Sequence, residues 1–134
     1  MGKHEIRIEG DVLFLKWVGE LSQSDVREIF DTMARMLAEH KWVFMVIDAR
    51  NATGWGRDAR RTAIDWPHQH RVGAVVHIGA SLTIRALTGL IAPALKMLRR
   101  ASPVPMYVND EEQALACVQA RRRELLASAE PRAH

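Results

Sequence analysis

The sequence has very little cysteine and no long hydrophobic run. Its single cysteine, Cys117, excludes an internal disulfide and is typical of a protein kept in a reducing compartment. The opening residues, MGKHEIRIEG, lack the apolar core of a signal peptide, and the longest apolar stretch, residues 86–98, is too short and too interrupted to cross a bilayer. We therefore expect a soluble, cytoplasmic protein without a membrane span.

A strong excess of one charge is also absent. The 134 residues include 19 lysines and arginines against 16 acids, which gives a net charge of +3 at pH 7. The basic residues do not alternate with aromatic ones, as they do on surfaces that stack nucleic-acid bases. The densest basic run, residues 121–123, suits the C-terminal end of a helix, where cations interact well with the helix dipole. The sequence therefore predicts no nucleic-acid partner.

The motifs of common enzymes are missing as well. The GWG sequence lacks the lysine and third glycine of a phosphate-binding loop. Ser81 lies between a strand and a helix, but Thr83 occupies the place of the second glycine of a nucleophile elbow, so Ser81 is interpreted as a helix N-cap. His68, His70 and His77 have the residue type of a zinc site, yet no cysteine or paired carboxylate completes it. We expect no catalytic residue, no metal and no cofactor.

What is present is an alternation of strands and helices within one domain. We assign residues 1–128 to this domain and expect residues 129–134 to form a flexible tail. Apolar periodicity predicts strands at 5–9, 12–19, 42–48, 74–78 and 104–108, and helices over 21–40, from about 57 to 66, over 82–100 and over 109–128. The order β-β-α-β-α-β-α-β-α predicts an α/β fold with a single mixed, mostly parallel five-stranded sheet and four helices.

Local signals mark several of these boundaries. Gly10 and Asp11 form a two-residue turn that makes the first two strands an antiparallel hairpin. Ser22, with Asp25 three residues later, resembles a capping box and starts the most regular helix of the chain. Pro93 breaks or kinks the helix over 82–100.

Strand patterns also predict the two faces of the sheet. One face is wholly apolar and is expected to be covered by the helices. The other mixes polar and aromatic residues and is expected to be only partly covered, so that a second copy of the chain covers it in a homodimer. The residues assigned to this second face are Phe14, Lys16, Val18, either Phe44 or Met45, His77 and Tyr107.

The element order and several segments resemble the SpoIIAA-like group of STAS domains, named for sulphate transporters and anti-sigma factor antagonists. The resemblance extends from His4 to Leu126 and is carried by the opening hairpin, by VIDARNATG, by RVGAVVHIG and by VPMYVNDEEQALACV. It implies a mixed sheet with helices added by successive β-α turns, a topology shared with lipid-carrying CRAL-TRIO domains. It also implies regulation and binding without catalysis.

The segment after the buried strand 42–48 is interpreted as a functional loop. Its candidate residues for binding a partner or ligand are Asp48, Asn51, Thr53, Trp55 and Arg57. Anti-sigma factor antagonists have a phosphorylatable serine in an Asp-Ser-Ser-Gly motif at the corresponding place. This segment departs from that motif because it has no serine, and Thr53, the nearest hydroxyl, is the candidate for phosphorylation. The alternative is that Thr53 is a turn residue and that Asp48 caps local backbone amides.

Trp55 is a bulky aromatic residue between two glycines of the same segment. Such a residue has little local reason to be in a loop, so we expect it to close over a cavity or to contact a partner. As a surface residue, its replacement by alanine is expected to leave stability nearly unchanged.

Two functions follow from these residues, and a third is not supported. The first, which the resemblance implies, is a regulatory module of bacterial signalling that pairs with a protein partner or with itself. The second is a carrier or sensor of a lipid or other small apolar ligand, with Leu90, Ile91 and Met97 lining the pocket. An enzyme would need a complete set of reactive groups, which the sequence does not supply.

Overall fold

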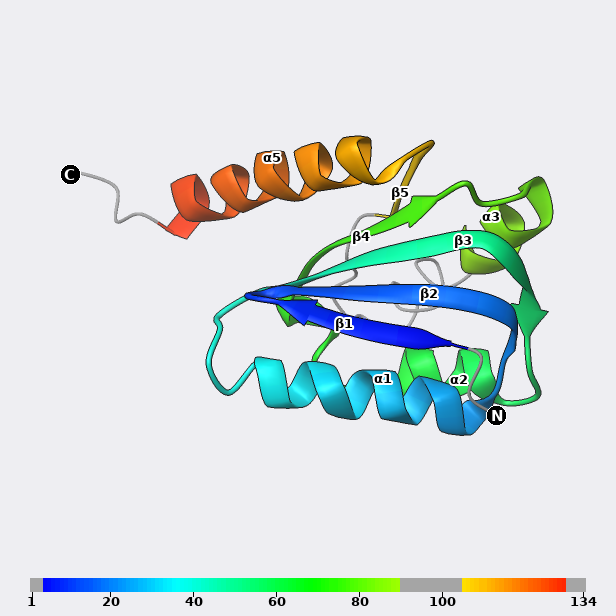
Figure 1. Cartoon of the computed structure of the whole chain (residues 1–134). Helices are drawn as coiled ribbons and strands as arrows, with labels where there is room; N and C mark the ends of the chain where they lie inside the picture. Colours follow the sequence, from blue (N-terminus) through cyan, green and yellow to red (C-terminus); the bar gives the residue numbers. More distant parts are fainter. Residues whose placement is uncertain (1–3, 90–104, 130–134) are drawn as a thin grey trace.

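The computed structural model describes residues 4–89 and 105–129. Its strands are β1 (Glu5–Glu9), β2 (Val12–Leu21), β3 (Val43–Trp55), β4 (Val72–Ile78) and β5 (Pro105–Val108). Its helices are α1 (Gln23–Met36), α2 (Ala59–Asp65), the 3₁₀ turn η1 (Gln69–Arg71), α3 (Leu82–Gly89) and α5 (Glu111–Ala129). Figure 1 shows them around one sheet. The predicted α/β fold is confirmed.

The sheet has the order β1-β2-β3-β4-β5, with β1 antiparallel to β2 and every other pair parallel. Glu9 pairs with Val12 across the predicted turn, in which Gly10 has a φ of +61° that favours glycine. β3 lies between β2 and β4, which explains why its first residues, Val43–Ile47, are all buried.

Capping interactions fix the ends of the two long helices. The Ser22 hydroxyl accepts from the Asp25 backbone N–H at 3.1 Å, and the Asp25 carboxylate accepts from the Ser22 N–H at 2.9 Å, so the predicted capping box is formed. Asp110 accepts from the Gln113 N–H at 2.8 Å and begins α5, and Ser81 accepts from the Ile84 N–H at 3.2 Å before α3.

Helices cover both faces of the sheet, which corrects the prediction that they gather on one. α1 and α2 lie below the sheet in Figure 1, and α5 lies above it. Alternate strand residues lie on opposite faces of the sheet. Leu13, Leu15 and Trp17 lie on the α1 side, and Val12 and Phe44 lie on the α5 side. Both faces therefore have an apolar core.

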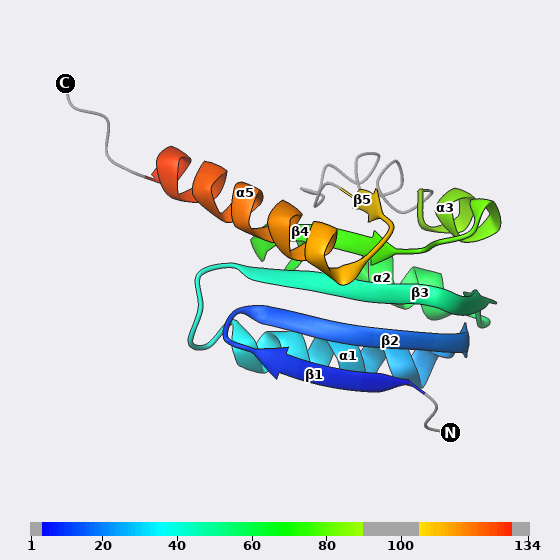
Figure 2. The same cartoon turned by 45° about the horizontal axis from the view of Figure 1, so that its top comes forward.

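The predicted mixed face for self-association is not formed as one surface. Phe14, Lys16 and Phe44 lie on the α5 side of the sheet. His77 pairs with Ile47 and lies with Tyr107 on the α1 side. α5 packs on β3, β4 and β5, and Figure 2 shows it displaced from β1. The face of β1 and β2 on the α5 side is left more open, with Phe14 half-buried and Lys16 exposed.

Residues 49–55 are strand, which corrects their interpretation as a loop. β3 is 13 residues long and stays paired with the ten-residue β2 to its end, where Leu21 pairs with Trp55. Two register shifts, opposite Trp17 and after Gly19, absorb the extra residues of β3. The chain turns only after Trp55, because Gly56 then donates its N–H to the Leu21 carbonyl.

Some predictions fall on residues outside the described part. These are the kink at Pro93, the proposed pocket residues Leu90, Ile91 and Met97, and the tail from residue 130 onward. Within residues 4–89 and 105–129, no helix has the length and apolarity needed to cross a bilayer.

Candidate functional site

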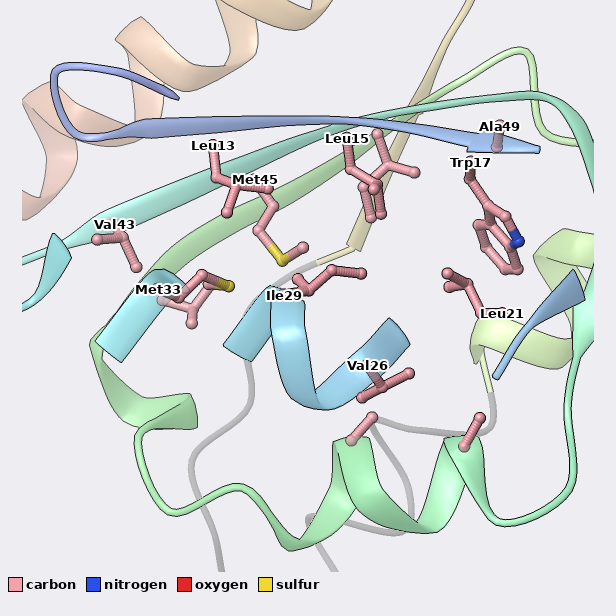
Figure 3. Packing of buried hydrophobic residues seen from close by; sticks show 14 of the residues in the cluster. Leu13, Leu15, Trp17, Leu21, Val26, Ile29, Met33, Val43, Met45 and Ala49 are labelled. Atoms are coloured by element: carbon pink, nitrogen blue, oxygen red, sulfur yellow. The ribbon is translucent and has the colours of Figure 1, made fainter. Parts of the chain in front are cut away.

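An apolar cavity of about 100 Å³ lies between the sheet and the helices α1, α2 and α3; we call it the core cavity. Figure 3 shows the strand side chains that point from this face of the sheet toward α1, among them Leu15, Trp17 and Met45. The residues that line the cavity are Leu15, Trp17, Leu21, Val26, Ile29, Phe30, Met45, Ile47, Trp55, Ala63, Gln69, Val72, Val75, His77, Thr88 and Pro105. Nearly all are apolar, so the cavity suits an apolar molecule.

Three ring nitrogens on this lining have no hydrogen-bond partner in the described part of the structure. They are Nε1 of Trp17, Nε1 of Trp55 and Nδ1 of His77. Trp17 is 1% exposed and His77 is 3% exposed. Buried polar atoms are nearly always paired, because leaving one unpaired costs about 1–3 kcal/mol. These are the three buried unpaired side-chain N or O atoms of the described residues, and all three belong to residues that line the core cavity.

His77 is held in its neutral form. Burial lowers the pKa of the imidazole to about 4, and an interaction with the Met106 backbone acts weakly in the opposite direction. The ring stacks on Tyr107 with centroids 5.2 Å apart, and the Tyr107 hydroxyl is 2.9 Å from the Thr88 hydroxyl. A neutral imidazole with a free Nδ1 offers a ligand one hydrogen-bonding position beside an aromatic ring.

Trp55 is part of the core, which corrects its assignment to an exposed loop. Its ring meets that of Trp17 edge to face, with centroids 5.4 Å apart and an angle of 68°. It packs against the α1-side cluster while half-buried, so its truncation will not leave stability unchanged. Trp55 lines the core cavity, and its role in binding a ligand or partner stays a prediction.

Asp48 forms a local ion pair. Its carboxylate accepts from Arg50 Nε at 2.9 Å and Nη2 at 2.8 Å, and also from the Arg50 backbone N–H at 3.2 Å. These hydrogen bonds from Arg50 lower the pKa of the Asp48 carboxyl. The Arg50 side chain lies against Gly79, where an added Cβ would collide with it. Asp48 therefore accepts from one local backbone amide, that of Arg50, and its role in binding a partner or ligand stays a prediction.

The other predicted site residues are not brought together. Asn51 and Thr53 are exposed within β3, and Arg57 is exposed between β3 and α2. Thr53 lies in a strand and not at the start of α2, which begins at Ala59. Their role in binding a partner, and the phosphorylation of Thr53, stay predictions.

The residues considered for metal or nucleophilic chemistry are dispersed. His70 is exposed, His68 meets Trp66 edge to face, and His77 is buried in β4. Among the residues that the structure describes, no group of three or more His, Cys, Asp or Glu side chains is placed to hold a metal ion. Cys117 is half-buried against the α5-side core.

Comparison with known proteins identifies the family. The family model described as SpoIIAA-like matches residues 12–119. The chain belongs to the SpoIIAA-like family. The anti-sigma factor antagonist SpoIIAA in its unphosphorylated form is similar, with a TM-score of 0.60, 11% identity, and 87% of this chain and 97% of that chain covered. No curated protein matches the sequence.

Two further structures share the SpoIIAA-like fold. An uncharacterised DUF3478-family protein from Shewanella loihica PV-4 has a TM-score of 0.60 and 19% identity, covering 84% of this chain and 90% of that chain. Phosphorylated SpoIIAA, the Bacillus cell fate determinant, has a TM-score of 0.58 and 12% identity, covering 86% and 98%. At these identities the comparison establishes the fold.

Proposed function

We propose that this SpoIIAA-like chain is a non-catalytic binding module that holds a small, largely apolar molecule in the core cavity. The observation that carries the proposal is the coincidence of this cavity with the unpaired nitrogens of Trp17, Trp55 and His77. An apolar molecule that carries one oxygen acceptor would fill the space and accept from an indole N–H. A purely structural core would have no reason to collect its unpaired polar atoms at one empty space.

The size of the core cavity limits what it holds. An engineered apolar cavity of about 150 Å³ stays dry and binds benzene. At about 100 Å³, the core cavity takes a group of a few carbon atoms or a small ring after slight expansion. Ordered water is the competing content, since water also pairs with ring nitrogens, but the apolar lining offers it few further partners.

Two similar structures are those of an anti-sigma factor antagonist and of a cell fate determinant, and these names support a role in regulation. In our proposal the chain acts in the same general way, by binding without catalysis. The signal that the chain would pass to a partner is whether the core cavity is occupied.

Calorimetric titration with phenol and toluene tests the proposal. The two probes have similar volumes, but only phenol offers an oxygen to an indole N–H. One added hydrogen bond of about 0.5–1.5 kcal/mol predicts that phenol binds about 2- to 10-fold more tightly than toluene. Ala63→Leu, which fills the cavity from α2, should abolish both. The matched change Ala34→Leu, at an exposed position of α1, should leave both unchanged. Absence of binding by either probe would contradict the proposal.

Self-association is a second candidate, favoured by the open face of β1 and β2. Phe14 is half-buried there, with the Arg7 guanidinium 4.2 Å from its ring centroid. We propose that a second copy of the chain covers this face. Sedimentation at micromolar concentration should then show a dimer that Phe14→Glu dissociates, because the variant loses the aromatic contact and would have to bury a carboxylate and the neighbouring Arg7 guanidinium together. A strictly monomeric wild-type protein would contradict it.

A further inference from the structure

A second hollow, of about 400 Å³, adjoins the core cavity; we call it the arginine hollow. Trp55 lines both spaces. α2 contributes Ala63 to the cavity and its neighbour Ile64 to the hollow, and α3 contributes Thr88 to the cavity and its neighbour Leu87 to the hollow. The two spaces therefore share Trp55 in their linings, and each is also lined by residues of α2 and α3.

The rim of the arginine hollow is positively charged. Arg60 is half-buried and Arg61 is exposed, and Asp58 is the acid of the lining. Within residues 4–89 and 105–129, neither guanidinium has an ion pair or hydrogen bond, although Arg50 is paired with Asp48 and Arg122 with Asp11. Two arginines and one aspartate leave one net positive charge beside the apolar side chains of Trp55 and Leu87.

The volumes show that the core cavity alone cannot contain a ligand of ordinary size. Ligand sites of small molecules occupy about 300–1,000 Å³, whereas the core cavity has about 100 Å³. Because Trp55 lines both spaces, a longer molecule whose apolar end enters the core cavity would extend past Trp55 toward the arginine hollow. Its remaining end then lies beside Arg60 and Arg61.

We propose that the ligand is a monocarboxylic acid whose carboxylate pairs with Arg60 and Arg61 while its largely apolar chain, which carries the oxygen acceptor of the proposed function, reaches into the core cavity. This inference rests on the proposed function. The planar guanidinium matches a carboxylate through two parallel hydrogen bonds, and Arg60 is half-buried, which reduces the competition from water. The single net charge favours a monoanion over a phosphate monoester, which carries up to two charges at neutral pH.

Calorimetric titration with octanoate, octanol and octyl phosphate compares three head groups on the same eight-carbon chain. We expect octanoate to bind about 10-fold more tightly than octanol, and its affinity to fall as salt is raised. Tighter binding of octyl phosphate than of octanoate would overturn the assignment to a carboxylate. Equal affinities of octanoate and octanol would overturn the role of the arginines.

Variants separate this inference from the proposed function. Arg60→Gln should weaken octanoate about 5- to 10-fold and leave octanol and phenol unchanged. Arg27→Gln is the matched control, because Arg27 is an exposed arginine of α1 that forms no ion pair or side-chain hydrogen bond with the described residues, and it should change none of them. If phenol binds the core cavity but Arg60→Gln leaves octanoate unchanged, only this inference fails. If neither phenol nor octanoate binds, the proposed function fails as well.

Discussion

His77 makes stability depend on acid in a way that can be calculated from the structure. Burial lowers the pKa of the imidazole to about 4 from an ordinary value of 6.5. Between these values the unfolded chain binds a proton that the folded chain does not. Titration of His77 therefore leaves the free energy of unfolding unchanged above pH 6.5 and lowers it progressively as the pH falls toward 4. Each unit of pKa difference corresponds to about 1.4 kcal/mol, so the full loss is about 3 kcal/mol.

Urea unfolding at pH 7.5, 6.5, 5.5 and 4.5 measures this loss. His77→Leu removes the titration and keeps an apolar side chain in the cavity wall, so the wild type should lose about 2 to 3 kcal/mol more than the variant between pH 7.5 and 4.5. The Asp48 carboxyl, whose pKa lies below 3.8 because of Arg50, titrates below this range. His70→Gln, at an exposed position, is the control and should behave as wild type. A difference below about 1 kcal/mol between wild type and His77→Leu would refute the assignment of a buried neutral histidine.

Further predictions concern individual side chains. Trp55→Ala should lower the free energy of unfolding in urea by about 2–3 kcal/mol, because it removes the contact with Trp17. A loss below about 0.5 kcal/mol would instead indicate that Trp55 is a surface residue. Gly73→Ala should cost about 1–3 kcal/mol, since its Cβ would collide with the buried Phe44 ring, and an unchanged midpoint would contradict that packing. Arg71→Ala should cost about 1–2 kcal/mol because Arg71 donates to the carbonyls of Leu37, His40 and Lys41, whereas Arg27→Ala should not. Phosphorylation of Thr53 is tested by intact-mass analysis of protein from its own cells, where absence of a phosphate adduct would contradict it.

Local signals predicted the elements of the fold well. Ser22 and Asp25 identified the start of α1, and Gly10 identified the first turn, because capping and turn formation depend on neighbouring residues alone. The buried strand from Val43 was evident from its uninterrupted apolar sequence.

Two features could not be predicted in the same way: the extension of β3 beyond Asp48, and the face of the sheet on which the side chains of each strand lie. Thr53 and Gly54 have the local preferences of a turn, but pairing with β2 and two register shifts keep them in a strand. Alternation shows which residues of one strand share a face. It does not show that His77 lies opposite Ile47, on the other face from Phe14, because that depends on register between strands.

The core cavity has no signal in the sequence. It is the space left after side chains from three helices and four strands have packed, and its lining reads as ordinary core. Trp55 gave the one indication, as an aromatic residue between two glycines. The sequence also gave no reason to associate Arg60 with Trp55, since their proximity depends on the turn from β3 into α2.

The occupation of the core cavity is tested most directly by the indole N–H resonances of a ¹⁵N-labelled sample during titration with phenol. The four tryptophans give four resolved reporters, and Trp42 packs on the α5 side of the sheet, away from the cavity. We expect the Trp17 and Trp55 signals to shift in proportion to saturation while the Trp42 signal stays in place. If Trp17 and Trp55 do not move, or if all four signals move together, the core cavity is not a ligand site.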